Sequence, residues 1–320
     1  IDDQEFFLKP MNCPFHIIVY SSALRSYREL PLRFAELGTV YRYERSGVLH
    51  GLMRVRGFTQ DDAHLFLRED QLQDEIQGCL GLVKLVFSIL GMDDYRVRVS
   101  LRDSESGKYV GDPAAWVKAE TALREAVKAL GVDYVEEIGE AAFYGPKIDF
   151  VAKDVIGREW QLGTVQVDYN LPERFDLHFN DADNQLKRPV MVHRAIFGSF
   201  ERFVGGLIEH FAAWFPIWLC PVPAAVLPIT ADQEEAAASM ARALEEAGFR
   251  TALRTEGPLR RRIRECEMEK IPYMAVLGER EVESGTVSLR VHGKDGQEAL
   301  SVEDFAARLR ERRDSRALEY

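Results

Sequence analysis

Short alternations of apolar and polar residues, separated by polar loops, dominate the first two thirds of the chain. Such alternation predicts strands, and we expect them over residues 40–44, 57–66, 143–151, 159–169 and 191–195. Apolar residues at helical spacing predict helices over 71–90, 114–130 and 198–213. Many strands joined by loops, with the helices grouped elsewhere, indicate a mainly antiparallel α+β domain.

The pattern changes after a proline-rich stretch at 216–223. From there the sequence alternates predicted strands over 224–229, 250–253, 273–277 and 286–291 with predicted helices over 231–247, 259–270 and 302–313. This alternation is typical of a small α/β unit of about 100 residues. We therefore expect two domains, 1–218 and 219–320.

Composition fits this picture. The 320 residues suffice for about two domains at roughly 150 residues each. With 46% hydrophobic and 29% charged residues, the chain is not disordered, collagen-like or a coiled coil. The net charge of -11 argues against a basic coat that binds nucleic acid over the whole surface, but a local basic patch is compatible with it.

Residues 211–229 form a 19-residue stretch without a charge, long enough to span a bilayer. Four prolines interrupt it, and a backbone broken in this way is poorly satisfied in lipid. We expect a helix end, a linker and a buried strand instead, and no membrane partner. The four scattered cysteines form no CxxC pair, which predicts a reduced, cytoplasmic protein.

Polar residues follow one face of the strand over 57–66. Period 2 places Gln60, Asp62 and His64 on the same face, which suits the floor of a polar pocket better than a core. Arg42 and Glu44 precede this strand and share a face of their own; alone, such a pair is typical of a solvated strand surface.

A second polar segment covers residues 193–202 and reads as a strand, a glycine turn and a helix start. Arg202 falls in the first turn of that helix. An arginine there can reach a phosphate or stack on a flat ring, although arginine near a helix start is common.

Together these two segments resemble motifs 2 and 3 of the class II aminoacyl-tRNA synthetases, and the finer match is to threonyl-tRNA synthetase. The resemblance is carried by residues 11–14 (MNCP), 41–44, 49–64, 160–166 and 193–202. It implies an antiparallel catalytic core followed by an α/β anticodon-binding domain. It also implies a reaction in which threonine and ATP give threonyl-adenylate, and the acyl group then moves to the 3′ end of tRNA(Thr).

The resemblance implies catalytic roles for Arg42, Arg54 and Arg202. Arg42 would bridge the carboxylate of threonine and the α-phosphate, and Arg54 and Arg202 would hold the γ-phosphate. Glu44 would accept from the adenine amino group, with Phe58 and Arg202 on the two faces of the ring. Mg²⁺ would accompany ATP. The implied ATP-binding set is Arg42, Glu44, Arg54, Val55, Phe58, Gln161, Thr164, Ser199 and Arg202.

Cys13, His64 and His193 match the zinc ligands of the family, which implies one Zn²⁺ per chain with an open fourth position. The spacing alone would not reveal this site. An apolar pocket rejects the isostere valine poorly, whereas a site that demands a polar partner discriminates far better. The substrate pocket would be completed by Gln60, Asp62, Tyr144 and Gln166.

Gln161 and Thr164 have opposite parity on their strand, although both match nucleotide contacts. A bulge at Gly163 would reset the register and place them on one face. In the second domain, Glu281 and Arg290 match anticodon contacts. Arginines at 254, 260–262 and 264 could meet phosphate or form a solvated helix face.

The sequence departs from the family at Phe15, where glycine is usual, and this predicts altered packing near Cys13. Residues 254–259 lack the expected Asn-Glu-Lys pattern. Motif 1 and the editing domain are expected upstream of residue 1, and a homodimer is expected where motif 1 is present. Expected partners are ATP, threonine and tRNA(Thr), with no DNA. Two alternatives stay open: a prolyl-type synthetase, and a catalytically weak paralogue that only binds RNA.

Overall fold

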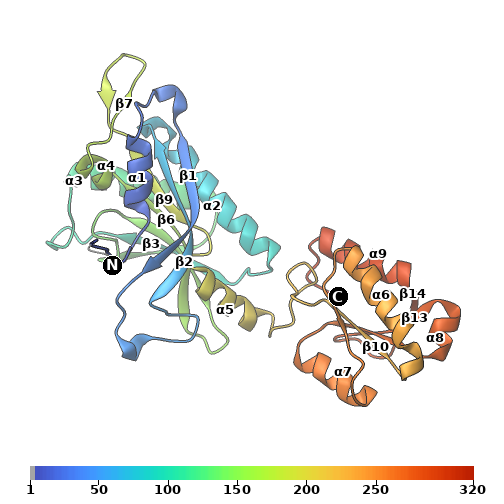
Figure 1. The fold of residues 1–320 in the computed structure, drawn as a ribbon. Helices are drawn as coiled ribbons and strands as arrows, with labels where there is room; N and C mark the ends of the chain where they lie inside the picture. The colour runs from blue at the N-terminus through green and yellow to red at the C-terminus, as the bar shows by residue number, and fades with distance from the viewer. Residues whose placement is uncertain (1–3) are drawn as a thin grey trace. The chain divides into compact units, whose positions relative to one another are not determined.

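The computed structural model describes residues 4–320 (Figure 1). By packing, the chain divides into two compact units, the first ending at Leu207 and the second running from Ile208 to Tyr320. Each unit has its own sheet, and each is described separately below.

The first unit is built on a seven-stranded sheet. Neighbouring strands are antiparallel, except that β3 and β4 are parallel. This arrangement confirms the predicted α+β class. Across the sheet, the strands are β1 (Leu32–Tyr41), β2 (Gly57–Leu67), β9 (Val190–Ala195), β6 (Glu159–Asp168), β5 (Lys147–Lys153), β3 (Tyr95–Leu101) and β4 (Tyr134–Ile138).

Helices cover the sheet where its apolar residues point outward. The long helices α2 (Leu72–Ile89) and α3 (Pro113–Leu130) pack against each other and against β6. Helix α1 (Cys13–Ser21) buries Tyr20 against Phe66 of β2, with the rings stacked at 4.5 Å between centroids. The remaining elements of this unit are η1 (Tyr27–Glu29), η2 (Ser46–Val48), η3 (Glu69–Gln71), α4 (Asn170–Arg174), the hairpin β7 (Phe179–Asn180) and β8 (Leu186–Lys187), and α5 (Phe200–His210), which runs into the second unit.

The second unit is a three-layer α/β fold. Strand β10 (Ala224–Pro228) is parallel to β11 (Thr251–Leu253) and β12 (Tyr273–Leu277), and β13 (Thr286–Val291) and β14 (Glu298–Ser301) continue the sheet antiparallel. Helices α6 (Glu234–Glu246) and α9 (Val302–Asp314) bury one face, and α7 (Leu259–Met268) the other. Two short elements complete it, η4 (Ala231–Gln233) and α8 (Glu279–Ser284).

The strand predicted over 40–44 is wrong. Strand β1 starts eight residues earlier, at Leu32, and ends at Tyr41, so that Arg42 and Glu44 follow it. The amide of Arg42 still donates to the carbonyl of Arg56 at 2.8 Å, which ties this segment to the start of β2. The beginning of β1 escaped prediction because it is an edge strand whose partly buried face includes the charged Glu36.

Smaller differences have local causes. Strand β5 begins at Lys147 because a turn bridged between Ala142 and Gly145 precedes it. Helix α5 begins at Phe200, after Gly198 adopts a φ of 79°, a left-handed conformation that favours glycine. The elements that were not predicted are α1, β3, β4, α4, β7, β8, α8 and β14.

Two local predictions are confirmed, the bulge near Gly163 and the buried strand in the uncharged stretch 211–229. In the β5–β6 pair, Asp149 faces Thr164 and Val151 faces Gln161, so three steps on β6 match two on β5 around Gly163. Between residues 4 and 320, no helix is long and apolar enough to cross a membrane. The uncharged stretch 211–229 instead contains turns and the fully buried strand β10.

Candidate active site and metal centre

One pocket of the first unit, about 390 Å³ in volume, collects every site residue that the sequence predicts for this unit. The floor comes from β2, β6 and β9, and the rim from the segment after β1 and the start of α5. The predicted residues that line it are Cys13, Arg42, Glu44, Arg54, Val55, Phe58, Gln60, Asp62, His64, Tyr144, Gln161, Thr164, Gln166, His193, Ser199 and Arg202.

Strand register explains how residues so distant in sequence meet. His64 of β2 lies opposite His193 of β9, and His193 lies opposite Gln166 of β6. The two imidazole rings meet edge to face, with 4.7 Å between centroids. Helix α1 begins at Cys13 and brings its thiol to the same place.

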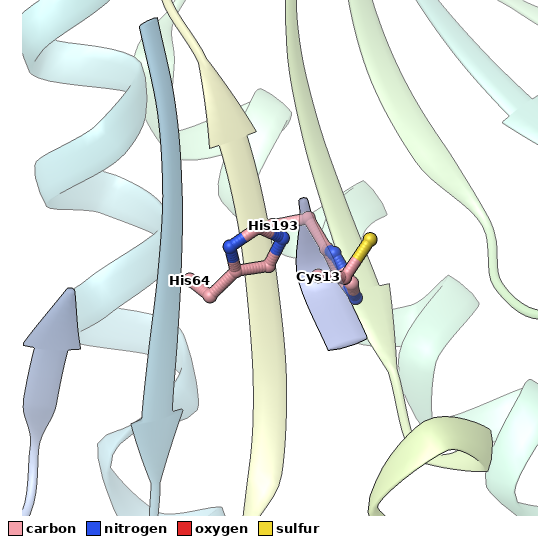
Figure 2. A group of neighbouring side chains, drawn as sticks. All are labelled: Cys13, His64 and His193. Carbon is pink, nitrogen blue, oxygen red and sulfur yellow. The ribbon is translucent and has the colours of Figure 1, made fainter. Parts of the chain in front are cut away.

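Cys13, His64 and His193 form a buried group of potential metal ligands (Figure 2). One sulfur and two imidazole nitrogens lie within 4.8 Å of one another. Thiolate and imidazole are the ligands that Zn²⁺ prefers, and three protein ligands leave a position for substrate. The donor set therefore fits zinc.

Each histidine of this group is oriented by a second residue. The Nε2 of His193 bonds Asp168 Oδ2 at 2.9 Å, which leaves its Nδ1 for a metal. The Nδ1 of His64 bonds the Nδ1 of His16 at 2.8 Å, which leaves its Nε2. Histidine ligands usually have such partners, which fix the ring and the tautomer. His16 is thus adjacent to the group but is not a member of it.

Electrostatics distinguishes the two histidines. Burial lowers the pKa of His64 well below its usual value, and His193 and His16 lower it further, so His64 is neutral and free to ligate. Burial also opposes protonation of His193, but its hydrogen bonds to Asp168 and Cys13 outweigh that effect and raise its pKa to about 10. A metal ion that binds there replaces that proton.

Asp62 lies beside this group and is held by Asn12, a residue of the MNCP segment. The fully buried amide of Asn12 donates to Asp62 Oδ2 at 3.0 Å. Burial raises the pKa of Asp62, while the Asn12 bond opposes that shift. Gln166 donates to the carbonyl of Gly145 at 3.0 Å, which fixes its amide. These contacts leave a small polar compartment whose chemistry would suit a ligand with amine and hydroxyl groups.

Cationic side chains line the rest of the pocket. Arg54 pairs with Glu44 at 3.0 Å. Arg42 lies over the ring of Phe58, 5.2 Å from its centroid. Arg202 donates to the carbonyls of Met53 and Gln161, both at 2.8 Å. Fixed arginines around one pocket suit a polyphosphate.

Several residues that shape the pocket were missed. Trp160 lies under Arg202, with 5.5 Å between the guanidinium carbon and the ring centroid. Lys147 lines the pocket from β5. Both lie in segments predicted as strands, but their own roles were not predicted, because the contacts that give them a role cross between strands. The ring of Phe15, where the family usually has glycine, is half-exposed and lies under the ammonium of Lys9, 5.2 Å from its centroid.

The predicted anticodon residues lie in the second unit. Glu281 accepts from the amide of Gly278 at 3.0 Å and caps α8. Arg290 lines a separate cavity of this unit, together with the stacked rings of Trp214 and His292. Arg262 is wrong as a phosphate contact: it is buried and donates to the carbonyls of Pro228 and Arg254 at 2.7 and 2.8 Å.

Comparison with known proteins identifies the family. The profile of the family described as "tRNA synthetase class II core domain (G, H, P, S and T)" matches residues 1–211, and that of "Anticodon binding domain" matches 223–312. The crystal structure of the RNA-binding domain of threonyl-tRNA synthetase from Cryptosporidium parvum superposes with a TM-score of 0.90 at 36% identity, over 98% of this chain and 78% of that one. The chain belongs to the threonyl-tRNA synthetase family.

The domain boundary expected at 218 falls between these two matches. The threonine–tRNA ligase of Thermus thermophilus is 54% identical to this chain over 317 residues, which are 98% of this chain and 48% of the relative. The chain thus covers about half the length of the curated threonyl-tRNA synthetases it matches. Prolyl-tRNA synthetase from Cryptosporidium parvum shares the fold alone, with a TM-score of 0.70 at 15% identity. The prolyl alternative is not favoured.

Proposed function

We propose that this chain is the catalytic and anticodon-binding part of a threonine–tRNA ligase. One observation carries the proposal: a single pocket joins a buried Cys–His–His group beside Asp62 to a set of fixed arginines. The first compartment suits the amine and hydroxyl of threonine, and the second suits the triphosphate of ATP. ATP, threonine and tRNA(Thr) are accordingly the proposed substrates, in the cytoplasm.

In the first step, an oxygen of the threonine carboxylate attacks the α-phosphorus, and pyrophosphate leaves. Arg42 offsets the repulsion between the two anions and stabilises the negative charge that builds up at phosphorus. Arg54 and Arg202 hold the departing phosphates, Mg²⁺ accompanies ATP, and Glu44, Phe58, Gln161, Thr164, Val55 and Ser199 place the nucleoside. In the second step, a hydroxyl of the terminal ribose of tRNA attacks the acyl carbon, and AMP leaves.

Selection of threonine is assigned to the polar compartment. Zn²⁺ held by Cys13, His64 and His193 would act as a Lewis acid toward the amine and hydroxyl of the substrate. Asp62 accepts protons from the same groups, and Gln60, Tyr144 and Gln166 close the compartment around the side chain. Valine offers no hydroxyl, so it would leave these buried polar groups unpaired, which is heavily penalised.

The second unit is proposed to read the anticodon through Glu281 and Arg290. Unpaired bases are recognised by hydrogen bonds to their edges and by stacking on flat side chains. A homodimer is proposed for the full-length protein.

Threonine-dependent ATP–pyrophosphate exchange by the full-length protein tests the proposal. We expect exchange with threonine and none above background with valine or proline. Arg42→Ala should abolish exchange, whereas Arg45→Ala, an exposed arginine three residues away that does not line the pocket, should leave it near normal. A full-length protein without threonine-dependent exchange would favour the RNA-binding paralogue, and near-normal exchange by Arg42→Ala would remove the role of Arg42.

A further inference from the structure

Asp149 of β5 is a fully buried carboxylate under the pocket, and it is bonded on both oxygens. Its Oδ1 accepts from Gln161 Nε2 at 2.7 Å and from Thr164 Oγ1 at 2.9 Å. Both of these side chains line the pocket, whereas Asp149 itself does not. The carboxylate is therefore a support beneath two proposed nucleotide contacts.

The bulge in β6 makes this double contact possible. In a regular strand, Gln161 and Thr164 would point to opposite faces. The extra residue at the bulge turns both side chains to the face of Asp149, and they also bond each other at 2.6 Å. A Cβ on Gly163 would lie 2.8 Å from the carbonyl oxygen of Ile196, so any other residue at this bulge would force the backbone to shift.

The other oxygen anchors the carboxylate and reaches a third pocket residue. Asp149 Oδ2 accepts from Arg98 at 3.1 Å and Ser100 at 3.2 Å, both on β3. It also accepts from Lys147 Nζ at 2.5 Å, and Lys147 lines the pocket. Two residues outside the pocket thus fix a carboxylate that in turn holds three residues inside it.

Gln161 extends the chain of contacts to the phosphate end. Its backbone carbonyl accepts from Arg202 at 2.8 Å. The position of the Gln161 segment therefore affects both its own amide and the guanidinium of Arg202.

We propose that Asp149 is the positioning residue of the nucleotide half of the pocket, which it organises through Gln161, Thr164 and Lys147. This inference rests on the proposed function, because it takes ATP as the ligand of that half. A purely structural role, as counter-ion of Arg98, predicts instead that Asp149 affects stability alone.

The test measures equilibrium binding of a non-hydrolysable ATP analogue with Mg²⁺, and separately of threonine, by calorimetry on the full-length protein. Asp149→Asn keeps the shape but removes the charge that accepts from three pocket donors. We expect the Kd for the analogue to rise about tenfold or more, in keeping with loss of a charge-assisted hydrogen bond, and the Kd for threonine to stay within about twofold. Glu137→Gln is the matched control, because Glu137 pairs with Arg98 at 3.2 Å but does not line the pocket.

If Asp149→Asn does not fold, Arg98→Met with Asp149→Asn removes both charges of this ion pair together. A raised Kd for the analogue in either variant, with Glu137→Gln unchanged, supports the positioning role. An unchanged Kd in a folded variant overturns it, as does an equal loss of threonine binding. A wild type that binds the analogue but performs no threonine-dependent exchange refutes the proposed function while leaving this binding comparison intact.

Discussion

Gly38→Ala tests whether Asn12 sets the position of Asp62. A Cβ on Gly38 would lie 2.4 Å from the Nδ2 of Asn12 and 2.6 Å from its Cγ, closer than real Cβ atoms approach. Gly38 cannot easily retreat, because it is paired with Gln60 in the β1–β2 ladder. Asn12 must therefore move, and its 3.0 Å bond to Asp62 is lost.

The magnitude follows from two opposing effects. Loss of a hydrogen bond to a charged group costs about 1.5–3 kcal/mol. Replacement of glycine by alanine returns about 0.4–1 kcal/mol by restricting the unfolded chain. The net destabilisation of the first unit should be about 1–2 kcal/mol. Calorimetry or urea unfolding of the variant measures this loss directly.

The same displacement should reach the substrate. We expect the KM for threonine to rise about tenfold, since about 1.4 kcal/mol of binding free energy corresponds to that factor, while the KM for ATP stays near the wild-type value. Gly78→Ala in α2 is the control: no atom lies within 4 Å of the added Cβ, so it should stabilise by about 0.5–1 kcal/mol.

A double-mutant cycle decides the mechanism. Asn12→Ala removes the side chain with which the new Cβ collides, so Gly38→Ala should cost nothing further in that background. Additive losses of stability and of threonine affinity in the double variant would refute the reasoning, because they would mean that the two residues act independently. A Gly38→Ala variant with wild-type threonine KM would refute it equally.

Three further outcomes follow from the geometry. Cys13→Ala should abolish the proposed binding of one zinc per chain, as measured by atomic absorption. Cys79→Ala, which changes a buried cysteine of α2, should keep the zinc. Zinc retained by Cys13→Ala would contradict the ligand assignment. Arg262→Met should lower the free energy of unfolding by about 2–3 kcal/mol, because the carbonyls of Pro228 and Arg254 lose the donor that this buried guanidinium supplies. The exposed Arg260→Met should cost less than about 0.5 kcal/mol, and equal losses would argue against that role. Trp160→Ala should raise the KM for ATP severalfold, because it removes a cation–π contact with Arg202 of about 0.5–2 kcal/mol. Trp160→Phe should return the KM most of the way to the wild-type value. An unchanged KM in Trp160→Ala would count against this contact.

Period-2 patterning was a sound guide for β2, whose polar face lines the pocket as predicted. Gln60, Asp62 and His64 line the pocket in that order, and Phe66 continues the same face and packs against Ile17 and Tyr20 of α1. Alternation can be recognised there because successive residues of one parity, Phe58, Gln60, Asp62 and His64, all face the same pocket. Burial alternates along β1 as well, but Glu36 lies on its partly buried face and Leu37 on its exposed face. The hydrophobic pattern of the sequence is therefore broken there, and the extent of that strand could not be predicted.

The supports of the site were invisible for another reason. Asp168 lies 25 residues before its partner His193, and His16 lies 48 residues before His64. Neither pair has a local spacing that a helix or strand would impose, because the contacts depend on which strands become neighbours. A resemblance to a known family can identify the metal ligands, but only the strand register of the folded chain shows which residues orient them.

The buried polar residues of the pocket floor make the folded chain less stable than apolar residues would, and they supply the functional groups of the site. Asp62, His64, Gln166 and His193 are all buried at the pocket floor, at positions where an apolar residue would pack at lower cost. Each has a polar partner, which keeps the penalty low but leaves the site dependent on the geometry of those partners. Substitutions among the partners should therefore alter ligand affinity well before they unfold the chain, whereas substitutions among the apolar residues behind the sheet should do the reverse.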